Sequence, residues 1–383
     1  MKYAVVGFGT AGYHAVKKIR ELDKEGCIDV YSNTGRAPYN PMLTTYYAFG
    51  KLEYEGMFPF GDLEQIQKEV DFNLRREQVI KVHGSEHLVE TENGSEQYDR
   101  ILIATGARAF APPVKGLEPE DAFLMRTVED ALRFKDRLKK NDIKHAVVIG
   151  ASMAGIKVVE VLHKYGIETW LLDLASYIFP LAAYKEVAKE IEKRVEAQGV
   201  HLMFGVTIDH MEQENGEKTA VLTDGSRIPA DIVGLCIGTR AITETVQGEV
   251  EIGRGIVVDD HMRTSVPGIY AAGDCCEGNN LESGQNQIIG LWANANHQGE
   301  TAGINMAGGD MAYKGNILHN ITHFMNMDFI GFGDNRMQGE VLEYGSLSED
   351  LYIRLVLDGK RIVGANILDN YRVSGIVKNY MLR

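Results

Sequence analysis

Two glycine-rich segments have the spacing that binds the pyrophosphate of a dinucleotide. They are Gly7-Phe8-Gly9-Thr10-Ala11-Gly12 and Gly150-Ala151-Ser152-Met153-Ala154-Gly155. In such a turn the first glycine permits the bend, the second lets the backbone approach the anion, and the third lets a helix pack on the preceding strand. The helix N-terminus then presents free N–H groups and partial positive charge, so phosphate binds without a lysine. One such turn is a weak signal, but two in matching surroundings predict two dinucleotide sites.

A carboxylate follows the second glycine segment where a ribose would need one. The apolar run Thr169–Leu172 ends at Asp173, eighteen residues beyond Gly155, and an acid near this distance binds a ribose diol. No arginine or lysine follows closely, and Asp173 would repel a 2′-phosphate. The segment therefore favours NADH over NADPH. The alternative is an aspartate that only begins a turn.

The first site has no acid at the corresponding position. The run Ile28–Tyr31 ends at Ser32 and Asn33, which become the candidates for the ribose contact. Asp29 lies inside the run, where its side chain points to one face of the sheet rather than off the strand end. A dinucleotide remains the expected ligand, bound there without a carboxylate.

The elements that must position these residues occur twice. Each glycine segment follows an apolar run and precedes a stretch able to form one amphipathic helix, over 13–22 and 156–165. Each unit then has a hairpin signal, Asn93-Gly94 or Asp224-Gly225, and a buried strand, within 99–106 or 231–238. This repetition indicates duplicated nucleotide-binding domains of the α/β class.

Composition excludes several function classes. The 383 residues suffice for about two or three domains. There are 54 acidic and 40 basic residues, a net charge of −14, which repels nucleic acid and anionic membranes. No apolar run approaches membrane-spanning length, no signal-peptide layout is present, and four irregularly spaced cysteines fit a reducing compartment. We expect a cytoplasmic protein without membrane insertion or nucleic-acid partner.

A third segment completes a known pattern. Thr264–Asp274 reads as a strand that ends in Gly273-Asp274, and a helical stretch over 292–306 follows. Together with Ala104-Thr105-Gly106 and both glycine segments, in this order, it closely resembles the pyridine nucleotide-disulfide oxidoreductase superfamily of FAD proteins. Within that superfamily it is most similar to the rubredoxin, ferredoxin and nitrite reductase flavoproteins. The resemblance covers about residues 1–335.

The resemblance implies an α/β fold with two Rossmann-like three-layer domains and a small C-terminal α+β domain. The FAD-binding domain would comprise residues 1–110 and 241–312, and the NAD(P)-binding domain would be inserted as residues 111–240. Residues 313–383 would form the C-terminal interface domain.

The resemblance also assigns cofactor residues. Asp274 would accept hydrogen bonds from the ribitol, the backbone of Val79 would meet adenine, and Trp292 would flank the flavin. For Trp292 helix packing is the alternative, and for Arg108 it is simple solvation. The FAD candidates are Gly7, Gly9, Gly12, Ser32, Asn33, Pro41, Met42, Val79, Thr105, Gly106, Arg108, Gly273, Asp274 and Trp292. The NAD candidates are Gly150, Ser152, Gly155, Asp173 and Gly238.

Two departures from the family pattern bear on mechanism. Disulfide-reducing members carry a reactive cysteine on the segment matching 39–43, and this chain has none there. Cys275 and Cys276 are expected to be buried small residues rather than a redox pair. The family also often has a basic residue in segment 39–43 and a glutamate at the position of Lys157. Lys157 is therefore the candidate source of positive charge at the flavin, the alternative being a helix lysine paired with Glu160.

The expected function is FAD-dependent oxidoreduction of NAD(P)H with an external acceptor. NADH gives hydride to FAD, and electrons pass to a redox protein such as rubredoxin, ferredoxin or another iron–sulfur protein, with no indispensable side-chain acid or base. No metal is expected, because His319 and His323 fall on a strand roughly 12 Å or more apart. Two alternatives stay open: the NAD-coupling FAD subunit of a larger iron–sulfur dehydrogenase, and an FAD/NAD-binding redox sensor or assembly protein. A homo-oligomer or a larger complex fits these readings.

Overall fold

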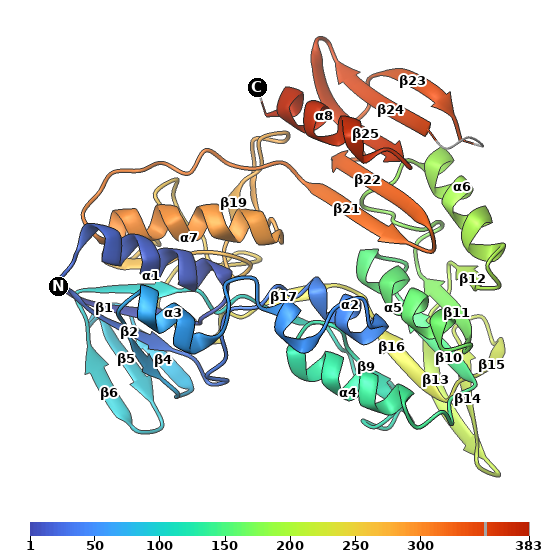
Figure 1. Cartoon of the computed structure of the whole chain (residues 1–383), viewed down its shortest axis with the longest axis horizontal. Helices are drawn as coiled ribbons and strands as arrows, with labels where there is room; N and C mark the ends of the chain where they lie inside the picture. The colour runs from blue at the N-terminus through green and yellow to red at the C-terminus, as the bar shows by residue number, and fades with distance from the viewer. Residues whose placement is uncertain (348–350, 383) are drawn as a thin grey trace. The chain divides into compact units, whose positions relative to one another are not determined.

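The chain passes several times between two units (Figure 1). The computed structural model describes residues 1–347 and 351–382. The first unit comprises Met1–Asn40, Tyr54–Arg108 and Arg240–Asn316, and the second comprises Pro41–Glu53, Ala109–Thr239 and the described residues of Ile317–Arg383. Segment 41–53, expected with the FAD-binding part, thus groups with the second unit. The four-part division of the chain stays a prediction.

The first unit is built on a five-stranded parallel sheet in the order β18-β7-β1-β2-β3. Its strands are β1 (Lys2–Val6), β2 (Cys27–Tyr31), β3 (Asn73–Arg75), β7 (Arg100–Ile103) and β18 (Ile269–Ala271). Most inner positions of β1, β7 and β18 are apolar and buried, as expected for parallel strands covered on both faces. Strand β1 lies between β2 and β7, so the turn after it opens at the centre of the sheet edge.

Two helices of the first unit, α1 (Thr10–Leu22) and α7 (Trp292–Met306), lie side by side (Figure 1). A Cβ on Gly299 would lie 2.3 Å from the carbonyl oxygen of Ala11, and one on Gly303 would lie 2.5 Å from that of Ala15. The helices therefore approach at a distance that excludes any side chain at these two glycines.

Smaller elements complete the first unit. A three-stranded antiparallel sheet contains β4 (Val79–His83), β5 (Leu88–Thr91) and β6 (Gly94–Gln97), with the predicted Asn93-Gly94 hairpin between the last two. The other elements are η1 (Tyr54–Met57), α3 (Leu63–Glu69), η2 (Glu244–Val246), β19 (Gly278–Asn279) and β20 (Asn286–Gln287).

The second unit repeats the parallel sheet in the order β12-β11-β10-β16-β9. The strands are β9 (Ala122–Phe123), β10 (His145–Ile149), β11 (Glu168–Asp173), β12 (His201–Phe204) and β16 (Ile232–Leu235). The helices are α2 (Leu43–Phe49), α4 (Val128–Leu138), α5 (Met153–Lys164) and α6 (Lys185–Glu196). The predicted second hairpin joins β14 (Glu217–Leu222) and β15 (Arg227–Pro229), and β14 also pairs with β13 (Ile208–Glu214) on its other side. Two short strands, β8 (Ala107–Ala109) and β17 (Thr239–Ala241), pair with each other.

The C-terminal part is an antiparallel sheet followed by a helix. The sheet order is β21-β22-β25-β24-β23, and the strands are β21 (His319–Phe324), β22 (Met327–Gly333), β23 (Glu340–Ser346), β24 (Leu351–Asp358) and β25 (Arg361–Leu368). The short η3 (Tyr371–Val373) leads into α8 (Ser374–Met381). Phe324, Met327 and Phe329 are buried in the hydrophobic core of the second unit. The α/β fold class with a small α+β part is therefore confirmed.

Helix starts differ from the sequence-based expectation. Helix α1 begins at Thr10 rather than Tyr13, and α5 begins at Met153 rather than Ile156, while α7 has the predicted bounds. The last glycine of each segment, Gly12 or Gly155, lies inside its helix because a glycine there lets the first turn pack on the strand. Within the residues that the structure describes, no helix is long and apolar enough to cross a membrane.

Candidate cofactor-binding sites

The turn after β1 is open at its middle glycine and closed at the other two. Gly7 has a φ of +105°, and a Cβ there would lie 2.3 Å from the carbonyl oxygen of Ala104. A Cβ on Gly12 would lie 2.2 Å from the carbonyl oxygen of Gly7. At Gly9, the N-cap of α1, no atom of the described residues lies within 4 Å of such a Cβ, and no side chain caps the helix. The N-terminus of α1 therefore has no side-chain cap and has room beside Gly9, which fits a pyrophosphate.

Three aromatic rings stand in a row in the first unit. Tyr13 stacks on Phe60 with 4.3 Å between centroids, and Phe60 stacks on Trp292 with 5.6 Å. The indole Nε1 of Trp292 is buried and has no hydrogen-bond partner in the described part of the chain. Such a buried donor is rare in folded proteins, and an acceptor atom of a bound cofactor would satisfy it. The residues present therefore fit FAD, while Phe60 also supplies the packing contact considered as the alternative for Trp292.

The other turns of the predicted FAD site lie at the same edge of the first sheet. Strands β1, β7 and β18 are neighbours and parallel, so the segments that follow them meet at one carboxyl edge. After β7, the Thr105 hydroxyl donates to the carbonyl oxygen of Ile242 at 2.6 Å, and Gly106 has a φ of +70°. After β18, a Cβ on Gly273 would lie 3.1 Å from the Cβ of Ala11 in the first turn of α1. The half-buried Asp274 follows directly.

The end of β2 is built from hydroxyl and amide groups. The Ser32 N–H donates to the carbonyl oxygen of Arg75 at 2.9 Å, and the Ser32 hydroxyl accepts from the Gly35 N–H at 3.3 Å. The Asn33 amide donates to the Gln78 side chain at 2.8 Å. Both residues therefore lie at the strand end where an adenosine ribose is expected. Their contact with ribose stays a prediction.

Asp29 lies within the sheet, on one face, as the strand alternation predicts. Its buried carboxylate accepts hydrogen bonds from Tyr98 at 2.8 Å, Asn73 at 2.9 Å and Arg75 at 3.1 Å. Burial raises the pKa of Asp29, but the three donors outweigh burial and hold that pKa below its ordinary value. Asp29 therefore ties β2 to β3 instead of reaching a ligand.

The remaining FAD candidates are spread over both units. Val79 is buried at the start of β4. Arg108 is exposed and forms an ion pair with Glu244 at 2.5 Å. Pro41 and Met42 precede α2 in the second unit. Contacts of these four residues with FAD stay predictions.

The second glycine turn repeats the construction of the first. Gly150 has a φ of +104°, and a Cβ there would lie 2.3 Å from the carbonyl oxygen of Cys236. A Cβ on Gly155 would lie 1.9 Å from the carbonyl oxygen of Gly150. Ser152 is the N-cap of α5, and its hydroxyl accepts from the Gly155 N–H at 3.2 Å and donates to Cys236 at 2.9 Å. The serine that stands for the middle glycine thus stabilises the helix start while the turn keeps its shape.

Asp173 lies at the end of β11 beside this turn. One carboxylate oxygen accepts from the Ala151 N–H at 2.7 Å, and the other accepts from the Ala175 N–H at 2.8 Å. Each oxygen has further lone pairs, so the carboxylate that closes the turn is also able to accept from a ribose diol. Gly238 follows β16 with a φ of +103°, and no described atom lies within 4 Å of a Cβ built on it. The residues present fit a nicotinamide dinucleotide.

Lys157 is buried on α5. Its ammonium donates to the Glu160 carboxylate and, at 2.7 Å, to the carbonyl oxygen of His323, and it lies 4.5 Å from the centroid of the Tyr46 ring. Burial lowers the pKa of Lys157 and outweighs the opposing effect of Glu160. The structure thus contains the Lys157–Glu160 pair that helix spacing offered as the alternative. A role of Lys157 toward the flavin stays a prediction.

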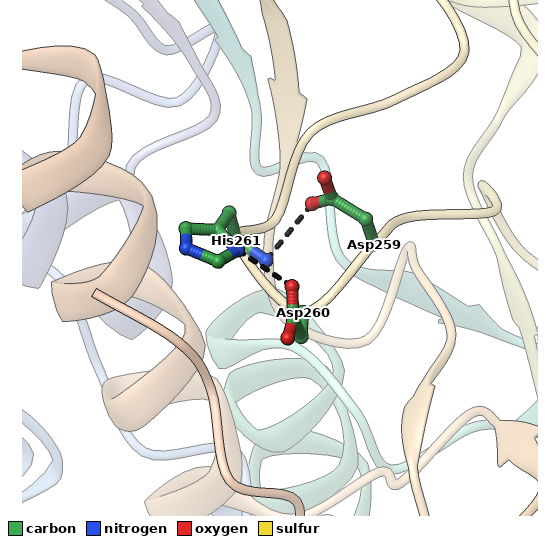
Figure 2. A group of neighbouring side chains, drawn as sticks. All are labelled: Asp259, Asp260 and His261. Atoms are coloured by element: carbon green, nitrogen blue, oxygen red, sulfur yellow. Dashed lines mark hydrogen bonds and ion pairs between the residues drawn. The ribbon is translucent and has the colours of Figure 1, made fainter. Parts of the chain in front are cut away.

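The buried cysteines and one acidic cluster lie outside this chemistry. Cys275 and Cys276 are buried free thiols that donate to the backbone carbonyls of Ala272 and Gly273. Figure 2 shows Asp259, Asp260 and His261, whose candidate ligand atoms lie within 4.8 Å of one another. Asp259 accepts from the N–H groups of His261 and Arg263, both at 2.8 Å, and the His261 ring bonds to Asp260 at 2.5 Å. Internal hydrogen bonds account for this cluster.

Sequence reasoning missed the polar face of α7. Gln298 accepts from the Gly273 N–H at 2.9 Å and so holds the corner before Asp274, while Asn294 donates to the carbonyl oxygen of Ile289 at 3.1 Å. The sequence contains the spacing, since polar residues recur at helical intervals here, but only the structure shows that they are buried. They are Asn294, Gln298, Thr301 and Asn305.

These two cradles, each on a parallel sheet with its glycine turn at the carboxyl edge, define a two-dinucleotide flavoprotein fold. The chain belongs to the pyridine nucleotide-disulphide oxidoreductase family, which its residues 1–299 match. It is an FAD-dependent NAD(P)H oxidoreductase with FAD as cofactor and NADH as co-substrate.

The chain is similar in sequence to several relatives and similar in fold to a solved structure. The chain is 27% identical to the NADH-dependent phenylglyoxylate dehydrogenase subunit epsilon of Aromatoleum evansii, over 100% of this chain and 91% of that protein. It is 28% identical to the 3-phenylpropionate/cinnamic acid dioxygenase ferredoxin–NAD(+) reductase component of Photorhabdus laumondii, over 80% and 77%. The NAD-dependent persulfide reductase from A. fulgidus has the same fold, with a TM-score of 0.91 at 24% identity over 100% of this chain and 76% of that one.

Proposed function

We propose that this enzyme passes electrons from NADH through FAD directly to an iron–sulfur protein. The observation that carries the proposal is the pairing of two dinucleotide cradles with a segment 39–43 that has no cysteine. Without a thiol at that position, electrons have no disulfide relay and must leave from the cofactor itself. Single-electron carriers such as rubredoxin, ferredoxin or another iron–sulfur protein suit that step.

The chain's own residues bind and orient the cofactors. The open turn at Gly9 and the N-cap Ser152 receive the two pyrophosphates, and Asp173 accepts from the ribose of NADH. Bound there, FAD would supply the chemistry that links a two-electron hydride donor to a one-electron acceptor. No proton needs to be moved by a side chain, so we assign no general acid or base.

The central experiment is an anaerobic titration of the purified holoprotein with NADH and then with NADPH, followed by absorbance. We expect a yellow protein whose flavin is bleached by NADH at lower concentration than by NADPH. Ferredoxin and rubredoxin should then reoxidise it rapidly, whereas small disulfides should not. A colourless protein that refuses added flavin contradicts the cofactor assignment, and rapid disulfide reduction contradicts the proposed acceptor class.

In a second candidate function the reaction is the same, but the enzyme is a subunit of a permanent complex. The relative from Aromatoleum evansii that spans this entire chain is named as a subunit of a dehydrogenase. The iron–sulfur acceptor would then be another subunit of a permanent complex rather than a mobile carrier. Native size-exclusion of the protein from its own cells separates the two, because a permanent subunit elutes with iron and with other polypeptides.

A further inference from the structure

Lysines from three segments surround helix α2 in the second unit. Helix α2 contacts α4 and α5 (Figure 1). The Lys135 ammonium lies 3.8 Å from the centroid of the Tyr47 ring, and the Lys164 and Lys51 ammonium groups lie 4.5 and 4.4 Å from that of Phe49. We call Lys51, Lys135 and Lys164 the α2 lysine cluster. Its members come from the end of α4, the end of α5 and the segment after α2.

The α2 lysine cluster carries excess positive charge. Glu160 is shared between Lys51, at 3.2 Å, and the buried Lys157. Neither Lys135 nor Lys164 has a carboxylate partner among residues 1–347 and 351–382, and Asp136 beside Lys135 is paired with Lys139 at 2.7 Å. Residues 41–52 contain no acid. The Lys164 ammonium donates to the carbonyl oxygen of Phe49, and each ammonium has three N–H groups, so further N–H groups of Lys135 and Lys164 are left for an incoming acceptor.

This local charge is opposite to that of the protein as a whole. The chain has a net charge of −14, so an acidic partner is repelled over most of the surface and is attracted only where cations gather. Lys51 and Lys164 are exposed and Lys135 is half-buried. Lysines at helix C-termini also stabilise helix dipoles, and that ordinary role predicts an effect on stability alone.

We propose that the α2 lysine cluster is the docking surface for an acidic iron–sulfur carrier protein, a proposal that rests on the function proposed above. Helix α2 begins at Leu43, directly after Pro41 and Met42, which are FAD candidates on the segment that the family resemblance places next to the flavin. Seven residues of helix span only about 10 Å. A carrier docked on the cluster would therefore lie within electron-transfer distance of that predicted flank.

The test uses the full-length holoprotein and a purified acidic [2Fe–2S] ferredoxin. Lys135→Glu and Lys164→Glu are made singly and together, with Lys189→Glu, an exposed lysine of α6, as the matched control. We expect the double variant to raise the KM for ferredoxin about tenfold or more at low salt, and the difference to shrink at about 0.3 M salt. Lys135→Arg, which keeps the positive charge, should have the same KM for ferredoxin as the wild type. Reduction of an uncharged quinone should be unchanged in every variant.

The other outcomes each overturn a distinct statement. An unchanged KM for ferredoxin in the double variant, or an equal rise in Lys189→Glu, overturns the docking surface and leaves the proposed function intact. A fall in quinone reduction or thermal stability without a change in that KM shows that the lysines only anchor α2. A wild-type enzyme whose flavin is reduced by NADH but which does not reduce ferredoxin or any other acidic iron–sulfur protein contradicts the proposed acceptor, and with it the docking surface.

Discussion

Gly7 and Gly150 illustrate what a sequence predicts at the scale of single residues. At each, a Cβ atom would lie 2.3 Å from a backbone carbonyl oxygen, so the requirement for glycine is local and its spacing is visible in the sequence. No local sequence pattern of this kind marks Phe60 or Gln298 as a residue of the site. Their contacts with Trp292 and Gly273 join parts of the chain that only the folded sheet brings together.

Asp173 should set the preference for NADH. In Asp173→Asn one carboxylate oxygen becomes an amide nitrogen, which cannot accept from an N–H or a ribose hydroxyl. We expect the KM for NADH to rise about tenfold or more, because a hydrogen bond to a charged group contributes about 1.5–3 kcal/mol. The KM for NADPH should change less, with flavin content unaffected. Steady-state kinetics with both nucleotides measure this, and Asp224→Asn, which keeps a turn-forming Asn-Gly pair, is the control. An unaltered nucleotide preference would reduce Asp173 to a turn residue.

Asp29 should make the stability of the first unit depend on pH in the acidic range. Because its pKa is lowered in the folded protein, the charged form stabilises the fold above the unfolded value of about 3.9. That stabilisation is lost as pH falls through the folded pKa. Asp29→Asn should therefore lower the free energy of unfolding at pH 7 by about 1–3 kcal/mol. This difference between the variant and the wild type should disappear below about pH 4. Thermal unfolding across this range tests it, with the exposed Asp71→Asn as control. A difference in free energy of unfolding that stays constant with pH would contradict the stabilising role of the charged Asp29 carboxylate.

At the scale of elements, the sequence predicted helices better than their packing. The bounds of α7 match the prediction because its residues contain no proline and end before Gly308-Gly309. The pairing of α7 with α1 could not be predicted, since it depends on two glycines meeting alanines almost 290 residues away. In the sequence Gly299 and Gly303 read as weak helix formers, whereas in the structure they set the distance between two helices.

Gly303→Ala should therefore separate α1 from α7. The new methyl group would meet the carbonyl oxygen of Ala15, which is backbone and cannot turn aside, so we expect a loss of about 1–3 kcal/mol from overpacking. Because α1 carries the first glycine turn, bound flavin should also fall. Flavin content and thermal unfolding measure both effects. Gly375→Ala in α8, where no described atom lies within 4 Å, is the matched control and should be neutral or stabilising. Equal behaviour of the two variants would exclude the close approach as the cause.

At the scale of the whole molecule, the sequence predicted two glycine turns on two separate parallel sheets, but it did not predict the grouping of segment 41–53. Its residues follow the first glycine turn in the chain, yet Ala48 packs in the core of the second unit. The predicted helix patterns gave no sign of this, because α2 has only seven residues and too few turns to show a periodic face.

The two units have separate hydrophobic cores, so cofactor removal should affect them unequally. A ligand that binds only the folded state stabilises it by RT ln(1 + [L]/Kd), about 2.7 kcal/mol at a hundredfold excess over Kd. Removing FAD should lower the temperature of the calorimetric transition of the first unit, and adding FAD again should restore that temperature. FMN should not, because it lacks the adenosine half that the end of β2 is expected to hold. The Asp29→Asn variant identifies the transition of the first unit, because it should lower the temperature of that transition. NADH should raise the temperature of the transition of the second unit. If FAD and NADH moved the same transition equally, the assignment of one dinucleotide to each unit would be wrong.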